Sequence, residues 1–200
     1  FISEEIIIMK KFIAAALLLV LVVSMLGCTK SAPPTRGTVT DGVYTNEYFG
    51  LSFTIPDGWR ALTDEEYKAK FTYTLPTNEE LAEFESEFQD VYITKTEDET
   101  DFMVISYSML FDKGSNDMQI KNKLAMIAMK VQFGIIDKIK IDDEDYSIMS
   151  GPVGDGTKVM YYFWSNKMVG NFRPLIWAQL DSTESIDSIL ANFSILQAAQ

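Results

Sequence analysis

The chain has 200 residues, of which 47% are hydrophobic and 12% aromatic, and its formal net charge is −12. This apolar content excludes a disordered chain, and the negative charge without a basic stripe argues against nucleic-acid binding. The sequence has no histidine and one cysteine, which excludes Ser-His and Cys-His nucleophile pairs, most zinc sites and an intramolecular disulfide bond. We therefore expect one globular domain that holds neither a metal nor a cofactor.

The N-terminal segment has the pattern of a signal peptide. Lys10 and Lys11 form a basic start, an uncharged apolar run follows over residues 12–26, and Gly27 and Cys28 end it. The run is shorter than the roughly 20 apolar residues that a transmembrane helix needs. A single membrane-spanning anchor is therefore the weaker of the two interpretations.

The stretch from Met25 to Cys28 resembles the lipobox of bacterial lipoproteins, with Gly27 before the cleavage site and Cys28 after it. Met25 and Leu26 depart mildly from the usual residues at their positions. The resemblance implies cleavage of the Gly27–Cys28 bond and a diacylglycerol on the Cys28 sulfur, and two acyl chains suffice for stable anchoring. Cys28 would then be neither a nucleophile nor a metal ligand. The protein would be extracytoplasmic, lipid-anchored in the outer leaflet of a bacterial cell membrane, on the periplasmic side in a Gram-negative host.

The residues on either side of this pattern set the expected segment boundaries. Glu4 and Glu5 are an unusual start for a signal peptide, so we hypothesise that translation begins at Met9. Pro33 and Pro34 favour an extended tether after the cysteine, which reaches roughly 40 Å at ~3.1 Å per residue. The expected segments are an over-extended gene start (1–8), the signal peptide (9–27), the lipidated cysteine with a flexible tether (28–42) and a single globular domain (43–200).

The first half of the expected domain combines a strand, two short helices and a hairpin. Leu51, Phe53 and Ile55 alternate with polar residues, which is typical of a half-buried strand. Capping boxes predict helices that begin after Thr63 and after Thr77. The remaining predictions here are that Leu81, Phe84 and Phe88 share one face of the second helix and that strands 91–96 and 102–111 form the hairpin.

The second half begins with the longest predicted helix, over residues 117–133. Asn116 with Gln119 caps its start, and Gly134 is expected to end it. A final helix is expected to begin at Ser182 or Thr183. The strands predicted between these helices are 137–141, 145–150, 157–165 and 172–180, and the final helix is expected to turn Ile186, Ile189, Leu190 and Phe193 inward.

The strand patterns also predict the fold class. Residues 160–164 and 175–177 are nearly continuous apolar runs, which indicates strands that are covered on both faces. Consecutive strands joined by short turns must be antiparallel. We therefore predict an α+β fold with an antiparallel β-sheet of about six or seven strands and helices packed on both faces.

The opening of the domain, from Tyr44 through Tyr48-Phe49-Gly50-Leu51, Phe53, Ile55-Pro56 and Gly58-Trp59, resembles the start of PsbP-like domains. Such domains occur in many bacterial lipoproteins, including the DcrB type. The resemblance implies an α/β/α sandwich over residues 44–196. It implies no activity, because the family supplies no shared catalytic set.

Three sequence features could be mistaken for, or could form, a ligand site. The acidic run 142–145 lacks the alternating ligands and the central glycine of a calcium loop, so we interpret it as a solvated turn. Residues 151–156 lack the Lys-Ser/Thr of a phosphate loop and are predicted to be a turn between strands. Four aromatic residues are predicted to be core residues first and a tentative binding surface for a sugar or peptide second: Tyr161, Tyr162, Trp164 and Trp177.

These observations favour a membrane-anchored surface lipoprotein whose domain is a non-catalytic binding or accessory module. Its ligand, a partner protein or an envelope component, is not identified by the sequence. The alternative is a hydrolase of cell-envelope carbohydrate that uses two carboxylates about 5–9.5 Å apart, one with a raised pKa. A surface coat protein without a defined ligand is a third interpretation.

Overall fold

The structure is a computed structural model that describes residues 33–83, 87–109, 114–128, 131–134 and 136–196. The chain divides into two compact units, 1–32 and 33–200, and every described residue belongs to the second. The predicted gene start, signal peptide, Gly27 and Cys28 lie outside the described residues. Within the described part, no helix has the length and apolar character that crossing a bilayer requires.

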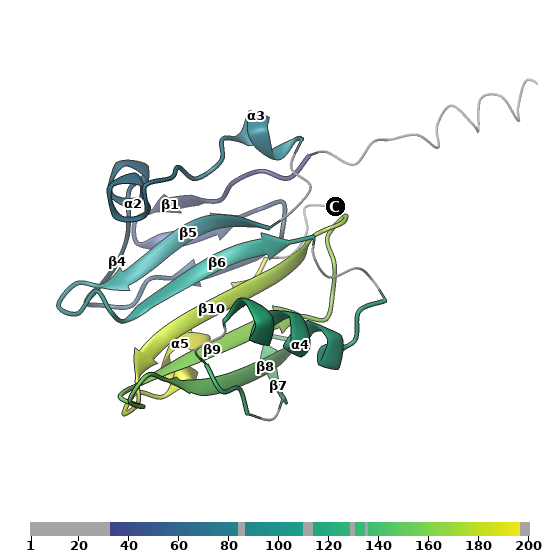
Figure 1. Ribbon diagram of the computed structural model, residues 1–200. Helices are drawn as coiled ribbons and strands as arrows, with labels where there is room; N and C mark the ends of the chain where they lie inside the picture. The colour runs from purple at the N-terminus through teal and green to yellow at the C-terminus, as the bar shows by residue number, and fades with distance from the viewer. Residues whose placement is uncertain (1–32, 84–86, 110–113, 129–130, 135, 197–200) are drawn as a thin grey trace, which may run out of the picture. The chain divides into compact units, whose positions relative to one another are not determined.

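A seven-stranded sheet forms the centre of the domain, and all its neighbouring strands are antiparallel (Figure 1). The predicted α+β class and its antiparallel sheet are therefore confirmed. In spatial order the strands are β4 (Trp59–Ala61), β5 (Phe88–Lys95), β6 (Phe102–Ser108), β10 (Arg173–Asp181), β9 (Lys158–Ser165), β8 (Glu144–Val153) and β7 (Asp137–Ile141).

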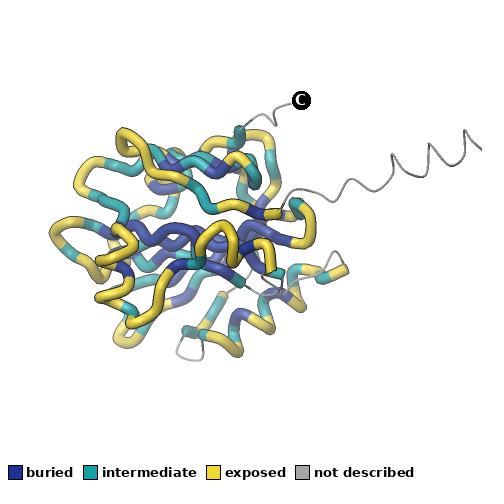
Figure 2. The backbone as a smooth tube through the Cα atoms, turned by 90° about the horizontal axis from the view of Figure 1, so that it is seen from above, coloured by how far each residue is buried: buried dark blue, intermediate teal, exposed yellow. Residues whose placement is uncertain are grey.

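A second, four-stranded sheet covers one face of the first, and only one of its strands was predicted. Phe53 and Phe193 of this sheet share a buried core with Ile93, Phe163 and Ile176 of the larger sheet. Figure 2 shows these buried segments gathered in the middle of the domain. In spatial order the strands are β1 (Thr38–Thr40), β2 (Val43–Asn46), β3 (Leu51–Thr54) and β11 (Phe193–Ile195).

Helices lie on both faces of the large sheet, as predicted. On the outer face, α2 (Asp64–Phe71) buries Tyr67 against β5 and β6, and α4 (Asp117–Ile127) buries Leu124 against β8 and β9. On the inner face, α5 (Ile186–Leu190) inserts Ile189 into the core between the two sheets. The short helix α3 (Asn78–Leu81) precedes β5.

Three of the four helix starts were predicted correctly, whereas the last helix begins at Ile186 after the N-cap Ser185 and not at Ser182 or Thr183. Reciprocal capping boxes begin α2 at Thr63, α3 at Thr77 and α4 at Asn116, as expected. The predicted helix 117–133 is wrong beyond Ile127, because the chain then runs along β8, where Val131 forms an antiparallel bridge with Val153. Gly134 donates a backbone hydrogen bond to Ser150 in that stretch and ends no helix.

Two further boundaries differ because long-range strand pairing overrides local periodicity. The helix that was expected to reach Phe88 ends at Leu81, and Phe88 instead begins β5 opposite Tyr107 of β6. Phe84 lies outside the described residues. Phe193 follows the last helix and belongs to β11, where it pairs with Phe53 of β3.

The described part of the expected tether, residues 33–42, is part of the domain. Residues 38–40 form β1, which pairs with β2, and the side chain of Arg36 reaches the carboxylates of Asp64 and Asp90. The tether prediction is therefore wrong from Pro33 onward. Local composition suggested a free segment, but ion pairs with residues far along the chain order it.

Candidate functional site

The four aromatic residues proposed as a binding surface are divided between the two faces of the large sheet. Trp164 and Tyr162 are buried beneath α4, so the core interpretation holds for these two. Trp177 is half-buried on the same face, beside Phe102. Tyr161 packs on the opposite face, against the core between the sheets, because successive strand residues point to opposite faces.

A buried carboxylate, Asp90, lies at the centre of a cluster of polar residues. It lies at a β-bulge between Gln89 and Val91, where the register of β5 against β6 shifts by one residue. Such an extra residue turns its side chain away from the regular alternation of the strand. The bulge thus aims Asp90 at the N-terminal segment and its side chain is wholly buried.

Donors from the N-terminal segment and β2 form hydrogen bonds with this carboxylate. Asp90 accepts hydrogen bonds from the Gly37 backbone N–H at 2.9 Å, the Tyr44 hydroxyl at 2.5 Å and the Asn46 amide at 2.8 Å. The Nε atom of Arg36 lies 3.6 Å from it. We call these five residues the N-terminal clasp. It ties the beginning of the domain to the core, since every one of its donors precedes or lies in β2.

Asp90 of the clasp and the neighbouring Asp64 provide one feature of the hydrolase alternative, two carboxylates at one cavity. Asp64 and Asp90 both line a cavity of about 180 Å³, and burial raises the pKa of Asp90 against the opposing effect of its hydrogen bonds. However, Arg36 bridges the pair and holds Asp64 through two hydrogen bonds of 2.9 and 3.0 Å. The chain's own donors therefore occupy both carboxylates, and we interpret the cluster as structural.

A second constellation resembles a Ser-Lys pair, and a carboxylate holds both of its members. The Oγ of buried Ser147 accepts a hydrogen bond from Lys138 Nζ at 2.6 Å and donates one to Asp117 at 2.9 Å. Burial would raise the pKa of Asp117, but hydrogen bonds from Lys138, Ser147 and Trp164 together lower it. Lys138 Nζ donates hydrogen bonds to both Asp117 and Ser147, so partners within the chain hold the lysine of this pair. The cluster instead attaches the start of α4 to β7 and β8.

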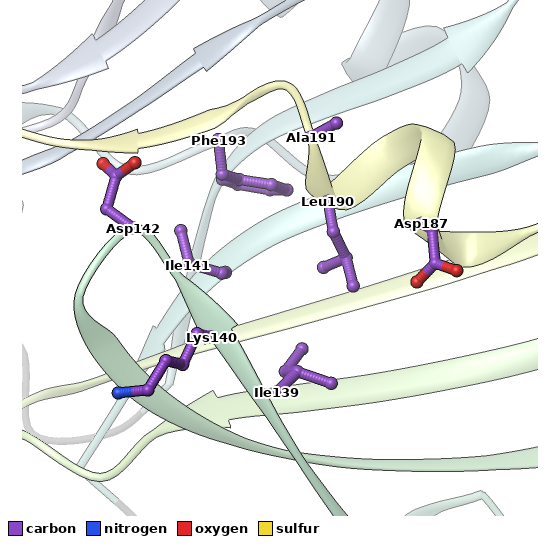
Figure 3. A pocket seen from close by; sticks show the side chains of 8 residues that line it. All are labelled: Ile139, Lys140, Ile141, Asp142, Asp187, Leu190, Ala191 and Phe193. Carbon is purple, nitrogen blue, oxygen red and sulfur yellow. The ribbon is translucent and has the colours of Figure 1, made fainter.

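An open cavity of about 450 Å³ lies between β7, the edge strand of the large sheet, and α5 (Figure 3). We call it the β7–α5 groove. Its lining residues are Ile139, Lys140, Ile141 and Asp142 from β7 and the following turn, and Asp187, Leu190, Ala191 and Phe193 from α5 to β11. Ile139, Ile141 and Phe193 also contact the core between the sheets, so the floor of the groove continues that core to the surface.

The turn after β7 closes one end of the groove. Asp142 adopts φ of 49°, a conformation that aspartate tolerates better than most residues, and its carboxylate accepts a hydrogen bond from the Ile195 backbone N–H at 2.6 Å. This bond links the edge of the large sheet to β11 of the small one. The solvated turn predicted for residues 142–145 is confirmed at Asp142 and Asp143, which are both exposed.

The outer edge of β7 carries backbone groups without a neighbouring strand. Ile141 pairs with Glu144 across a two-residue turn, so this is a hydrogen-bonded pair, and the pattern then alternates along the hairpin. Ile139 consequently bonds to β8, whereas the N–H and C=O groups of Lys138 and Lys140 point outward. Among the described residues, no strand follows β7 in the sheet.

Acidic side chains lie at both ends of the groove. Asp142 and Asp187 lie at its two ends in Figure 3, and each accepts a hydrogen bond from within the chain, from Ile195 and Ser185 respectively. The lysine of the groove, Lys140, forms an ion pair of 2.9 Å with Asp145. The groove is therefore apolar at its floor and negative at its ends. Among the described residues, no group of three potential metal ligands is close enough to hold an ion.

Comparisons with known proteins leave the family of this chain open. No family model matches it, and no curated protein matches it. The chain is similar to a crystal structure from Bacteroides thetaiotaomicron VPI-5482, determined at 1.50 Å resolution, with 13% identity and a TM-score of 0.40. The match covers 83% of this chain and 50% of the other, so this chain spans about half its length. At this level of similarity the match supports no inference about function.

Sequence reasoning missed the groove because its two walls lie far apart in the chain. The residues of β7 alternate two lysines with Ile139 and Ile141, which indicates one exposed and one covered face. Lysines on a strand also indicate a sheet edge. These two signals could have identified the edge, but only the packing of α5 beside it forms a cavity.

Proposed function

We propose that this chain is a membrane-anchored surface lipoprotein whose domain is a non-catalytic binding module, with the β7–α5 groove as its ligand site. The groove carries this proposal, because it joins an apolar floor to a free strand edge, and ligand sites are mostly apolar hollows with a few fixed polar groups. The two carboxylates and the Ser-Lys pair that could support catalysis are both occupied by partners within the chain. The resemblance to PsbP-like domains stays a prediction.

The proposed anchor is the diacylglycerol on Cys28. Because the compact unit begins at Pro33, the proposed anchor precedes it by five positions, which span at most roughly 18 Å when fully extended. This limit is less than half of the reach expected from a tether that continues to residue 42. A domain held this closely would act on partners at the membrane surface.

Metabolic labelling tests the anchor separately from the ligand site. Cells that express the full-length chain incorporate an alkyne-tagged fatty acid into it, and Cys28→Ser abolishes the label. An inhibitor of the lipoprotein signal peptidase leaves the uncleaved precursor. Label that persists in the Cys28→Ser chain would contradict lipidation at this residue.

A matched pair of substitutions tests the groove. Ala191 and Ala82 both follow short helices as exposed C-cap residues, with φ of −61° and −63° respectively. Ala191→Trp places an indole in the groove, whereas Ala82→Trp adds the same side chain beside α3. Each variant is cross-linked in native membranes, and the full-length chain is then captured in detergent. The amount of cross-linked partner recovered with each variant is measured.

We expect Ala191→Trp to lower recovery of the cross-linked partner at least about tenfold, and Ala82→Trp to leave it at the unsubstituted level. Circular dichroism checks that both variants are folded. Equal recovery with both variants would remove the groove as the ligand site.

A further inference from the structure

The β7–α5 groove combines the two elements that recognition by strand addition uses. One wall is a strand edge whose Lys138 and Lys140 backbone groups point outward, and the other is the helix α5. A segment that pairs with such an edge gains main-chain hydrogen bonds, while hollows beside the edge select its alternate side chains. We propose that β7 binds an extended peptide of a partner protein as an added strand, with the pattern basic–x–apolar–x–basic. This inference rests on the proposed function of the groove.

The apolar position of this pattern follows from the floor of the groove. Residues that pair across strands point to the same face, so a partner residue opposite Ile139 would face Leu190. Figure 3 shows the Ile139 and Ile141 side chains directed to the side of Leu190 and Phe193, and Lys140 extending away from them. One apolar side chain at the middle of the bound segment would therefore cover the apolar floor of the groove.

The basic positions follow from the charges at the ends. Asp137 is exposed and lies two residues before Ile139, on the same face of β7. Asp187 and Asp142 lie at the two ends of the groove. Lys138 and Lys140 do not cancel these charges, because they form ion pairs with Asp117 and Asp145 respectively. A lysine or arginine on each side of the apolar residue would meet an acidic side chain.

The same charges argue against a second copy of this chain as the occupant. Self-pairing of β7 would bring together two chains that each carry a net charge of −12. It would also set two strands with lysines on one face against each other, and like charges directly opposite destabilise a strand pair. A basic segment of another protein would be attracted to the acidic ends of the groove, whereas a second copy of this acidic chain would be repelled.

A peptide array tests the predicted pattern. The probes are synthetic peptides on a threonine and serine background, with three alternate positions varied over Lys, Glu, Val and Asn, applied to the full-length chain in detergent. We expect the Lys–x–Val–x–Lys peptides to bind at least about tenfold more tightly than the Glu–x–Val–x–Glu and Lys–x–Asn–x–Lys peptides. Their binding should weaken as salt rises, because the charges at the groove are exposed.

A proline substitution tests the backbone part of the inference. Lys140→Pro removes an outward N–H without removing a bond to β8, whereas Lys140→Ala removes the same side chain and keeps the N–H. We expect the best peptide to bind Lys140→Pro at least about tenfold more weakly than Lys140→Ala. In the unsubstituted chain, the peptide should slow hydrogen exchange of the Lys138 and Lys140 amides and leave the Ile139 amide, already bonded to β8, unchanged.

The outcomes separate this inference from the proposed function. Peptides that bind Lys140→Pro and Lys140→Ala equally would overturn strand addition while the groove remains a site. An array without bound peptides, together with loss of the cross-linked partner in Ala191→Trp, would overturn the peptide partner and keep the binding module. A dimer in sedimentation that Lys140→Pro dissociates would replace the partner with a second copy. If neither peptides nor the cross-linked partner respond, both proposals fall.

Discussion

The N-terminal clasp and the β7–α5 groove lie toward opposite edges of the same seven-stranded sheet. The polar groups of the clasp are hydrogen-bonded within the chain, whereas those at the groove edge point outward. In the clasp, donors from Arg36, Gly37 and Tyr44 converge on Asp90, and the acceptor is buried. In the groove, the outward backbone groups of Lys140 have no neighbouring strand among the described residues. Buried polar groups require partners within the chain, whereas exposed ones are free to find them outside. The clasp therefore stabilises the fold, and the groove is the region that we propose as the binding site.

The strongest test of this contrast removes the acceptor of the clasp. Asp90→Ala leaves the Arg36 guanidinium, the Gly37 N–H and the Asn46 amide without their buried partner, which costs about 3–5 kcal/mol in the free energy of unfolding. Urea unfolding of the full-length chain, followed by tryptophan fluorescence, measures this loss. Asp57→Ala, at an exposed turn residue, is the control and should change stability by less than about 0.5 kcal/mol. A loss as small for Asp90 as for Asp57 would show that the clasp is dispensable.

The next largest effect is expected from the backbone that reaches into the clasp. A Cβ atom on Gly37 would lie 2.7 Å from Tyr44 Cζ and 2.8 Å from the Thr45 carbonyl oxygen. Tyr44 cannot move aside easily, since its hydroxyl bonds to Asp90, so Gly37→Ala should cost about 1–3 kcal/mol. At Gly134 the added Cβ would lie 3.5 Å from the Ser150 carbonyl oxygen, an ordinary contact. Gly134→Ala should therefore be neutral or slightly stabilising, and equal losses at the two sites would refute the close packing.

A smaller effect tests the ion pair between Arg36 of the clasp and Asp64 through its pH dependence. The hydrogen bond from Arg36 holds the pKa of Asp64 below its ordinary value. A lowered pKa means that this carboxylate stabilises the fold above its unfolded pKa, about 3.9, and that the contribution is lost as the pH falls through the folded pKa. Because the Asp64 side chain is 57% exposed, solvent screens this ion pair, so its loss in Arg36→Gln should cost less than about 1 kcal/mol at neutral pH and progressively less below about pH 4.

Nuclear magnetic resonance measures the same change directly. Titration of the Asp64 carboxyl carbon should show its pKa rising toward the ordinary value in the Arg36→Gln chain. Asp155, whose pKa is lowered by hydrogen bonds from Thr157, serves as the internal control and should not respond. An unchanged Asp64 pKa would mean that the ion pair is absent in solution.

The smallest expected change in stability lies at the groove. Lys140→Pro removes an N–H that points away from the sheet, so the melting temperature should fall by less than about 3 °C. Ile139→Pro, one residue earlier, removes an N–H that bonds to β8 and should lower it by at least about 6 °C. Thermal unfolding by circular dichroism compares the two. Similar losses would contradict the assigned hydrogen-bond pattern and with it the free edge.

Local sequence patterns determined the elements whose signals lie within a few residues. The three capping boxes begin α2, α3 and α4 as predicted, because a side chain and a backbone N–H three residues apart satisfy each other without tertiary help. The predicted strand 137–141 agrees with β7 in both its ends. The apolar run at residues 160–164 indicated a doubly covered strand, and β9 is covered on both faces. The fold class followed from these patterns.

Tertiary structure alone decided which segments are ordered by distant contacts and where a groove remains at the surface. Arg36 lies in a segment whose composition indicated a tether, but Asp90, more than fifty residues away, orders it. Helix α4 ends before the segment that bridges to β8, where Val131 pairs with Val153. Strand β11 pairs with the edge of β3 that β2 does not occupy. The groove likewise requires α5 to lie beside β7. Such contacts depend on residues that meet only after folding, so no local periodicity records them.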